Sequence, residues 1–110
     1  MIVPATTSLA PTPTTWLLSI LYADTMPELR DLMRDRLALD GHQVETVADG
    51  EETLARLTQA GPAFDLVIID HQMPRIDGLD LMWHIRQLSF TGKIIVLGPG
   101  FSPATIERYR

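Results

Sequence analysis

Four short apolar runs alternate with segments of helical periodicity along this chain, and that alternation limits the possible folds more than any other feature. The runs occupy residues 16–23, 43–48, 65–70 and 93–97. The run over 65–70 is apolar on both faces, which is typical of a central strand in a parallel sheet. Strands that alternate with helices at this spacing predict an α/β domain with helices on both faces of a parallel sheet. Right-handed crossovers restrict the topology to a doubly wound sheet.

Start and stop signals place the helices between these runs. Pro27 lies at a first helical turn, where its missing N–H costs nothing, and Gly41 follows that helix as a stop. Asp49 begins a capping box, in which its carboxylate accepts the N–H three residues on. Residues 77–78 predict the start of a third helix, and a short final helix is expected over 104–110. The apolar face of the third helix comprises Leu81, Ile85 and Leu88.

The first residues of the chain are rich in proline and threonine. We expect an extended tail over 1–15, or equally a remnant of a linker, and a folded domain over 16–110. The apolar run over 16–23 is too short to span a bilayer, and no basic residue precedes it as a signal peptide requires. The sequence therefore predicts no membrane segment.

Charge and cysteine content argue against several classes of protein. The chain carries 9 basic and 14 acidic residues, and its net charge is −5 with histidine neutral. It therefore lacks the basic surface of a nucleic-acid-binding protein. It contains no cysteine, which excludes disulfides, thiolate metal sites and a cysteine nucleophile. The lack of cysteine fits a reducing compartment, and we expect the protein in the cytoplasm.

Two aspartates end buried strands at the edge where such sheets carry their function. Asp24 ends the first apolar run and Asp70 ends the third. If these strands are neighbours, both carboxylates meet at the carboxyl edge of the sheet, where they require a cation or a shared proton. Mg²⁺ suits such a site, and a carboxylate beside it can act as a nucleophile toward a phosphoryl group. The alternative is that both aspartates only cap helices or loops.

A longer motif surrounds the second of these aspartates. In residues 65–78, an apolar strand ends at Asp70, Met and Pro follow three and four residues on, and Asp and Gly follow seven and eight residues on. This segment resembles the phosphoacceptor segment of bacterial response-regulator receiver domains. Residues 20–32 resemble the first strand, acidic loop and first helix of that family, and residues 48–57 resemble its second helix. The likeness extends from about residue 17 to about residue 108.

The resemblance implies a flavodoxin-like, three-layer αβα fold and a role in two-component signalling. It implies that Asp70 accepts a phosphoryl group from a histidine kinase. It also implies a Mg²⁺ site made by Asp24, Asp70 and the backbone carbonyl of Gln72. His71 would lie in the same pocket, as a pH-sensitive neighbour, a metal ligand or a loop residue at the cleft.

The chain departs from the family pattern at three places. Thr25 occupies the position of the second acidic residue, and the loss of one carboxylate is expected to weaken Mg²⁺ binding. Gly98 follows the fourth strand where the family has Ser or Thr, so the switch hydroxyl is absent. The fifth strand, which bears a lysine in the family, and the fifth helix have no counterpart in the sequence.

These departures lead to an expectation about assembly. Without a fifth strand, the edge of the strand over 93–97 would be unpaired, and unpaired edges promote association. Without a fifth helix, one apolar face of the third and fourth strands would be uncovered. We therefore expect a homodimer that uses this edge or this face.

Two functions remain open, and a third is disfavoured. In the first, Asp70 accepts a phosphoryl group from a histidine kinase and the domain passes the signal to another protein. In the second, a degenerate receiver acts as a dimerisation or interaction module without phosphorylation, which Thr25 and Gly98 favour. A small hydrolase that uses Asp70 usually has a second acid two residues on, where this chain has Gln72. We therefore do not expect an enzyme.

Overall fold

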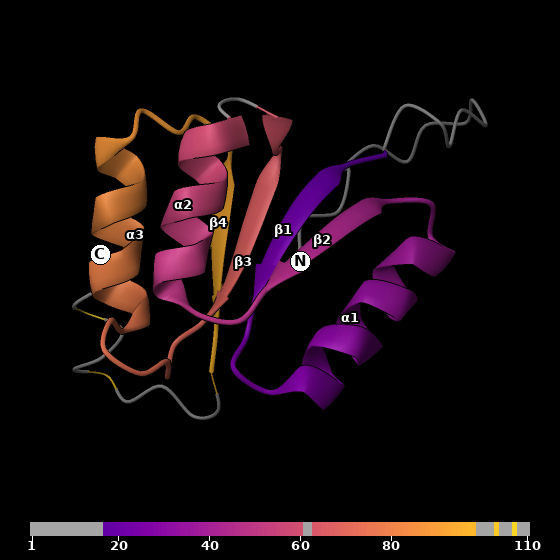
Figure 1. Cartoon of the computed structure of the whole chain (residues 1–110), viewed down its shortest axis with the longest axis horizontal. Coiled ribbons are helices and arrows are strands. Elements are labelled where there is room, and N and C mark those ends of the chain that lie inside the picture. Colours follow the sequence, from indigo (N-terminus) through magenta and orange to yellow (C-terminus); the bar gives the residue numbers. More distant parts are fainter. Residues whose placement is uncertain (1–16, 61–62, 99–102, 104–106, 108–110) are drawn as a thin grey trace.

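The computed structural model describes residues 17–60, 63–98, 103 and 107. Within them, strands and helices alternate along the chain (Figure 1). The elements are β1 (Ser19–Ala23), α1 (Pro27–Leu39), β2 (Gln43–Val47), α2 (Gly50–Ala60), β3 (Leu66–Asp70), α3 (Gly78–Gln87) and β4 (Lys93–Leu97). Each of the four predicted strands is therefore confirmed, with bounds that differ by up to three residues.

The four strands form one parallel sheet in the order β2-β1-β3-β4. Helix α1 lies on one face of this sheet, and α2 and α3 lie on the other (Figure 1). Helices on both faces make three layers, because each βαβ crossover places its helix on one side of the sheet. The predicted doubly wound, flavodoxin-like αβα fold is confirmed.

Two apolar clusters hold the layers together, one on each face of the sheet. Alternate residues of a strand point to opposite faces, so neighbours in β1 belong to different clusters. Leu21 of β1 packs with Leu81 and Ile85 of α3, and all three are fully buried. Ile20 of β1 packs on the α1 side, where Met33 of α1 adjoins it. Burial on both faces explains the unbroken hydrophobic runs Ile20–Ala23 in β1 and Leu66–Ile69 in β3.

The predicted helix signals appear in the structure as backbone geometry. Pro27 occupies the first turn of α1. Gly41 follows α1 with a φ of +92°, a left-handed conformation that favours glycine, and its N–H donates to the carbonyl of Ala38 at 2.9 Å. Asp77 precedes α3 and its carboxylate accepts the N–H of Asp80 at 3.0 Å. These starts and stops are confirmed.

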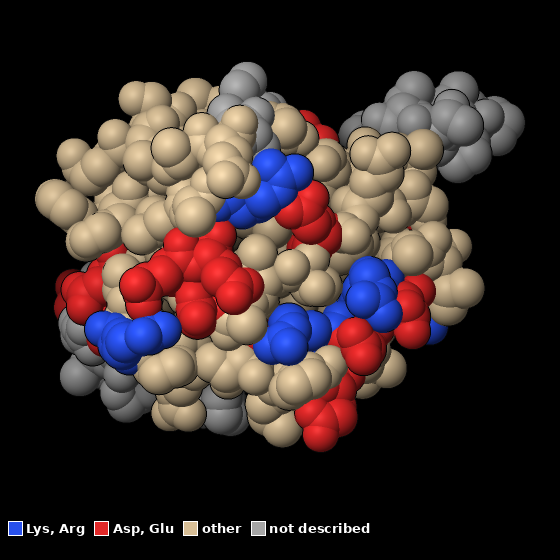
Figure 2. Space-filling model, in the orientation of Figure 1, with Lys and Arg blue, Asp and Glu red and all other residues tan. Residues whose placement is uncertain are grey.

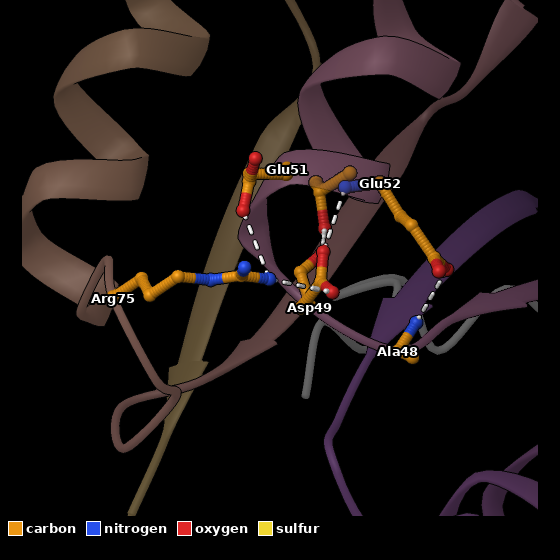
Figure 3. Close-up of polar contacts among 6 residues, drawn as sticks. Ala48, Asp49, Glu51, Glu52 and Arg75 are labelled. Carbon is orange, nitrogen blue, oxygen red and sulfur yellow. Dashed lines mark hydrogen bonds and ion pairs between the residues drawn. The ribbon is translucent and has the colours of Figure 1, made fainter.

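The capping box at the start of α2 is reciprocal (Figure 3). The Asp49 carboxylate accepts the N–H of Glu52 at 2.9 Å, and the Glu52 carboxylate accepts the N–H of Ala48 at 2.9 Å. Arg75, from the loop after β3, forms ion pairs with Asp49 at 3.5 Å and with Glu51 at 2.9 Å. The cap of α2 and the loop after β3 are thereby joined.

The structure corrects two expectations about buried surface. The spacing of Leu88 predicts a place on the apolar face of the third helix, but α3 ends at Gln87 and Leu88 is 41% exposed at the C-cap. The prediction of an uncovered face on the third and fourth strands is wrong for β3, where Leu66 and Ile68 are only 4% and 6% exposed, whereas Ile95 of β4 is half-buried. Among the described residues β4 pairs with β3 alone, so the prediction of association now depends on the edge of β4.

Several expectations lie outside the described residues. These are the tail over 1–15 and most of the final helix over 104–110. Across the part of the chain that is described, none of the helices is long and apolar enough to cross a bilayer.

Candidate functional site

Asp24 and Asp70 lie at the same edge of the sheet, as the sequence predicts. Strands β1 and β3 are neighbours, and Ala23 of β1 is paired with Ile69 of β3. Each aspartate is the next residue along its strand, so both reach the carboxyl edge together. This edge is where parallel α/β sheets place their functional groups.

The Asp24 carboxylate is buried and held at both oxygens. The residue is only 3% exposed. Its Oδ2 atom accepts a hydrogen bond from the Tyr22 hydroxyl at 2.7 Å, and its Oδ1 atom accepts one from the N–H of Met26 at 3.0 Å. The Arg30 guanidinium, on α1, donates to the Asp24 backbone carbonyl at 2.7 Å. The acidic loop is thus fixed to both β1 and α1.

Asp70 lies at the end of β3 and is half-buried, so it is more accessible to solvent than Asp24. Burial raises the pKa of Asp70 above its ordinary value, the backbone N–H of Gln72 opposes this rise, and the negative charge of Asp24 adds to it. The N–H of Gln72 donates to Oδ1 of Asp70 at 3.2 Å. Asp24 and Asp70 follow the paired residues Ala23 and Ile69, so the two carboxylates lie near each other at the end of neighbouring strands.

The loop after β3 is fixed by backbone hydrogen bonds. The N–H of His71 donates to the carbonyl of Leu97 in β4 at 2.7 Å, and the N–H of Gly78 donates to the carbonyl of His71 at 3.0 Å. His71 is half-buried directly after Asp70. The loop therefore presents Asp70 and Gln72 in a defined arrangement.

The remaining predicted residues lie at the same edge. Thr25 is half-buried directly after Asp24, Gln72 is exposed after Asp70, and Gly98 follows β4, which pairs with β3 up to Asp70. Gly98 has no side chain to offer a hydroxyl at this position. The structure thus brings every residue of the predicted site to one edge of the sheet.

The oxygen atoms at this edge suit Mg²⁺. They come from the carboxylates of Asp24 and Asp70, the carbonyl of Gln72 and the hydroxyl of Thr25. Mg²⁺ prefers oxygen, keeps several of its waters and is commonly bound by one or two carboxylates. In the described part of the chain, no group of three or more His, Cys, Asp or Glu side chains is arranged to hold a metal. The donor set therefore fits a Mg²⁺ ion that keeps several of its own waters.

Comparison with known proteins decides the family. Residues 20–108 match the family model for the response regulator receiver domain. The chain belongs to this family. Receiver domains generally bind Mg²⁺ at the phosphorylation site and interact with histidine kinases and other signalling proteins. The expected place of this chain in two-component signalling is thereby confirmed.

Curated relatives come from regulators and from a sensor kinase. The receiver is 32% identical over 68 residues to the transcriptional regulatory protein TrcR of Mycobacterium tuberculosis, covering 62% of this chain and 26% of TrcR. It is 38% identical over 73 residues to the response regulator MprA of Mycolicibacterium vanbaalenii, covering 66% of this chain and 29% of MprA. It is also 38% identical over 76 residues to the sensor histidine kinase RcsC of Salmonella typhimurium, covering 69% of this chain and 8% of RcsC. The receiver thus spans less than a third of each relative.

Solved structures show the same fold. The chemotaxis response regulator CheY4 of Vibrio cholerae superposes with a TM-score of 0.75 at 29% identity, covering 84% of this chain and 77% of CheY4. The N-terminal domain of a response regulator receiver protein from Methanoculleus marisnigri gives a TM-score of 0.76 at 28% identity, covering 84% of this chain and 76% of that one. A chain of the CheX-CheY-BeF3-Mg²⁺ complex from Borrelia burgdorferi gives a TM-score of 0.79 at 20% identity, covering 89% of this chain and 75% of that one, which is a likeness of fold alone.

Sequence reasoning missed two residues of this site. These are Tyr22, which lies within the apolar run over 16–23, and Arg30, which lies within the segment over 20–32. The available signal for Tyr22 was its position two residues before Asp24, which places both side chains on one face of a strand. No comparable signal pointed to the contact of Arg30 with the backbone of Asp24.

Proposed function

We propose that Asp70 is the phosphoacceptor of this receiver and takes its phosphoryl group from a phosphorylated histidine of a kinase. The observation that carries this proposal is the half-buried carboxylate at the end of β3, held by Gln72 beside the buried Asp24. A carboxylate in this position is a competent nucleophile toward phosphorus. The family supplies the class of donor, and the donor itself is unidentified.

The transfer exchanges one bond for another at phosphorus. A carboxylate oxygen of Asp70 forms a bond to phosphorus while the bond from phosphorus to the imidazole nitrogen breaks. The imidazole keeps the electron pair and takes up a proton from water. The protein contributes mainly positioning and charge, because phosphoryl transfer depends chiefly on these. The loop that His71 and Gly78 tie together keeps Asp70 in place.

We propose that Mg²⁺ is held by Asp24, Asp70 and the carbonyl of Gln72, with Thr25 as a neutral neighbour. When bound, the cation neutralises charge on the phosphoryl oxygens. Thr25 carries no charge where the family has a carboxylate. The affinity for Mg²⁺ is therefore expected to be lower than that of a site with three carboxylates.

Intact mass spectrometry tests the phosphoacceptor directly. The protein is incubated with a small acyl-phosphate donor and Mg²⁺ beside two variants, Asp70→Asn and Asp80→Asn. Asp80 is exposed in the first turn of α3, so its variant controls for the loss of one carboxylate. The proposal expects one added phosphoryl group in the native protein and in Asp80→Asn, and none in Asp70→Asn. Addition that persists in Asp70→Asn, or no addition to folded native protein, would refute it.

A second candidate function is interaction without phosphorylation. Thr25 and Gly98 favour it, since each lacks a group on which the phosphorylated state of the family relies. Under this alternative, a partner binds the native protein and Asp70→Asn equally well. Absence of phosphoryl labelling in the folded native protein, together with unchanged partner binding in Asp70→Asn, would favour the interaction module over the phosphoacceptor.

We also propose that this domain forms homodimers through β4 and acts in the cytoplasm. Within the described residues β4 is an edge strand, its three central residues are half-buried, and Leu97 is 39% exposed. Sedimentation at tens of micromolar is expected to give the mass of two chains, and Leu97→Asp is expected to weaken the association. A mass of one chain for the native protein would refute the dimer.

We propose no nucleic-acid partner for this domain. On the face in Figure 2, blue basic groups lie next to red acidic groups rather than in one basic surface. Arg34, which forms ion pairs with Asp31 and Asp35, is an example of this pairing. Such interspersed charge, with a net charge of −5, gives little attraction for phosphate backbones.

A further inference from the structure

The Tyr22 hydroxyl is directed at a carboxylate of the proposed magnesium site. Tyr22 lies in β1 two residues before Asp24, so both side chains leave the strand on the same face. The hydroxyl donates to Oδ2 of Asp24 at 2.7 Å, and both residues are only 3% exposed. A hydrogen bond from a hydroxyl to a carboxylate in a buried setting is strong and directional.

A second donor completes the restraint on Asp24. The N–H of Met26 donates to Oδ1 at 3.0 Å, so each carboxylate oxygen accepts one hydrogen bond. A carboxylate oxygen has two lone pairs, so each oxygen retains one for a cation. The two donors therefore fix the direction of the carboxylate without consuming its capacity to bind metal.

We propose that Tyr22 is a positioning residue for the magnesium site, and that its hydroxyl holds the Asp24 carboxylate in the orientation that binds the cation. The inference rests on the proposed function, because it assumes that Asp24 and Asp70 hold Mg²⁺. Thr25 supplies no charge, so the site depends on two carboxylates, and any freedom of Asp24 weakens it. Loss of a group that orients a metal ligand commonly weakens metal binding about tenfold or more.

A purely structural role is the competing explanation. A buried tyrosine usually finds a hydrogen-bond partner for its hydroxyl, and Asp24 serves as that partner whether or not metal binds. In that case removal of the hydroxyl lowers the stability of the fold but leaves magnesium affinity unchanged. Affinity and stability must therefore be measured separately.

Calorimetric titration with magnesium chloride at constant ionic strength provides the test. It compares the native protein with Tyr22→Phe, Asp70→Asn and Thr58→Val. Thr58→Val removes an exposed hydroxyl that donates to the carbonyl of Leu54 on α2, and it is the matched control. We expect affinity about tenfold lower in Tyr22→Phe, unchanged in Thr58→Val and abolished in Asp70→Asn.

A spectroscopic measurement keeps the test decisive if Tyr22→Phe folds poorly. The chain contains two tyrosines, so Tyr109→Phe leaves Tyr22 as the only one. The NMR signal of its labelled ζ-carbon reports the hydrogen bond of the hydroxyl. We expect this signal to move as magnesium saturates the protein, and to stay still when Asp70→Asn is added.

The outcomes separate the two proposals. If magnesium binds neither to the native protein nor to the control, both the metal site and the role of Tyr22 are wrong. If binding is lost in Asp70→Asn but Tyr22→Phe binds as tightly as the native protein, only the role of Tyr22 is overturned. A Tyr22 ζ-carbon signal that does not move when magnesium binds also overturns the role of Tyr22.

Discussion

Restoring the missing acidic residue should make magnesium binding tighter and the metal-free fold weaker. In Thr25→Asp, a third carboxylate joins Asp24 and Asp70 at the carboxyl edge of the sheet. Two unit charges about 4 Å apart in water interact by about 1 kcal/mol, so a divalent cation gains about 2 kcal/mol. That gain corresponds to about 30-fold tighter binding. The half-buried position of Thr25 places the effect nearer this aqueous limit than the much larger interior value.

The same charge acts against the fold when no cation is present. Repulsion is expected to cost about 1 kcal/mol of unfolding free energy for each of the two carboxylates, Asp24 and Asp70, again from the aqueous limit at about 4 Å. For a domain of this size the midpoint of thermal unfolding falls by about 4–8 °C per kcal/mol. Added magnesium should reverse the loss, because a ligand that binds only the folded state stabilises it.

Calorimetry and thermal unfolding, each with and without magnesium at constant ionic strength, measure both effects. Thr25→Asn is the matched control, since it has the shape of aspartate without the charge. Without magnesium, Thr25→Asp should unfold at a lower temperature than Thr25→Asn. In the titration, Thr25→Asp should bind magnesium more tightly than Thr25→Asn. If Thr25→Asp binds magnesium no better than Thr25→Asn, the cation does not lie beside this position and the proposed site is wrong.

Three further predictions concern the helix cap, the loop after β3 and the titration of the phosphoacceptor. Asp49→Ala should cost about 1 kcal/mol by removing the cap of α2, whereas Asp49→Asn keeps an acceptor and should cost far less in chemical denaturation. Arg75 has a φ of 69°, a left-handed conformation that glycine adopts without strain. Arg75→Gly and Arg75→Ala both lose the ion pairs, but only glycine removes the backbone strain, so Arg75→Gly should be more stable by about 1 kcal/mol. Equal stabilities would contradict this. The folded protein holds the Asp70 proton more tightly than the unfolded chain, so the native fold loses stability as pH rises above 3.8, the ordinary pKa. Asp70→Asn should therefore raise the thermal midpoint at neutral pH and leave it unchanged at a pH below that value, and an equal gain at both would refute the assignment.

The sequence predicts the sheet and its functional edge because both follow from local patterns. Runs that are apolar on both faces indicate buried parallel strands, and an aspartate at the end of each run falls at the carboxyl edge in any doubly wound order. Asp24 and Asp70 meet there as expected. The order of Asp49 and Glu52 likewise predicts a capping box without any knowledge of the tertiary structure.

The sequence does not predict contacts that depend on where separate elements come together. Arg75 reaches Asp49 and Glu51 only because the loop after β3 passes beside the start of α2 (Figure 3). Leu88 has the right spacing for the apolar face, but α3 ends one residue earlier and the side chain turns outward. The contact of Arg75 requires the tertiary arrangement, and the exposure of Leu88 requires the exact end of a helix, which periodicity determines poorly.

Thr25 and Tyr22 affect the same site through different physical quantities, so their effects should be coupled. Thr25 lowers the charge that attracts a cation, and Tyr22 limits the freedom of Asp24, whose orientation matters most when few carboxylates are present. A third carboxylate at position 25 would also attract the cation, so magnesium affinity would depend less on Asp24. Tyr22→Phe should therefore weaken magnesium affinity less in the Thr25→Asp background than in the native protein. A double-mutant cycle of magnesium affinities measures this coupling, and residues in contact with one network commonly show non-additive effects. Strict additivity would mean that the hydroxyl of Tyr22 and the charge at position 25 act on separate features of the site.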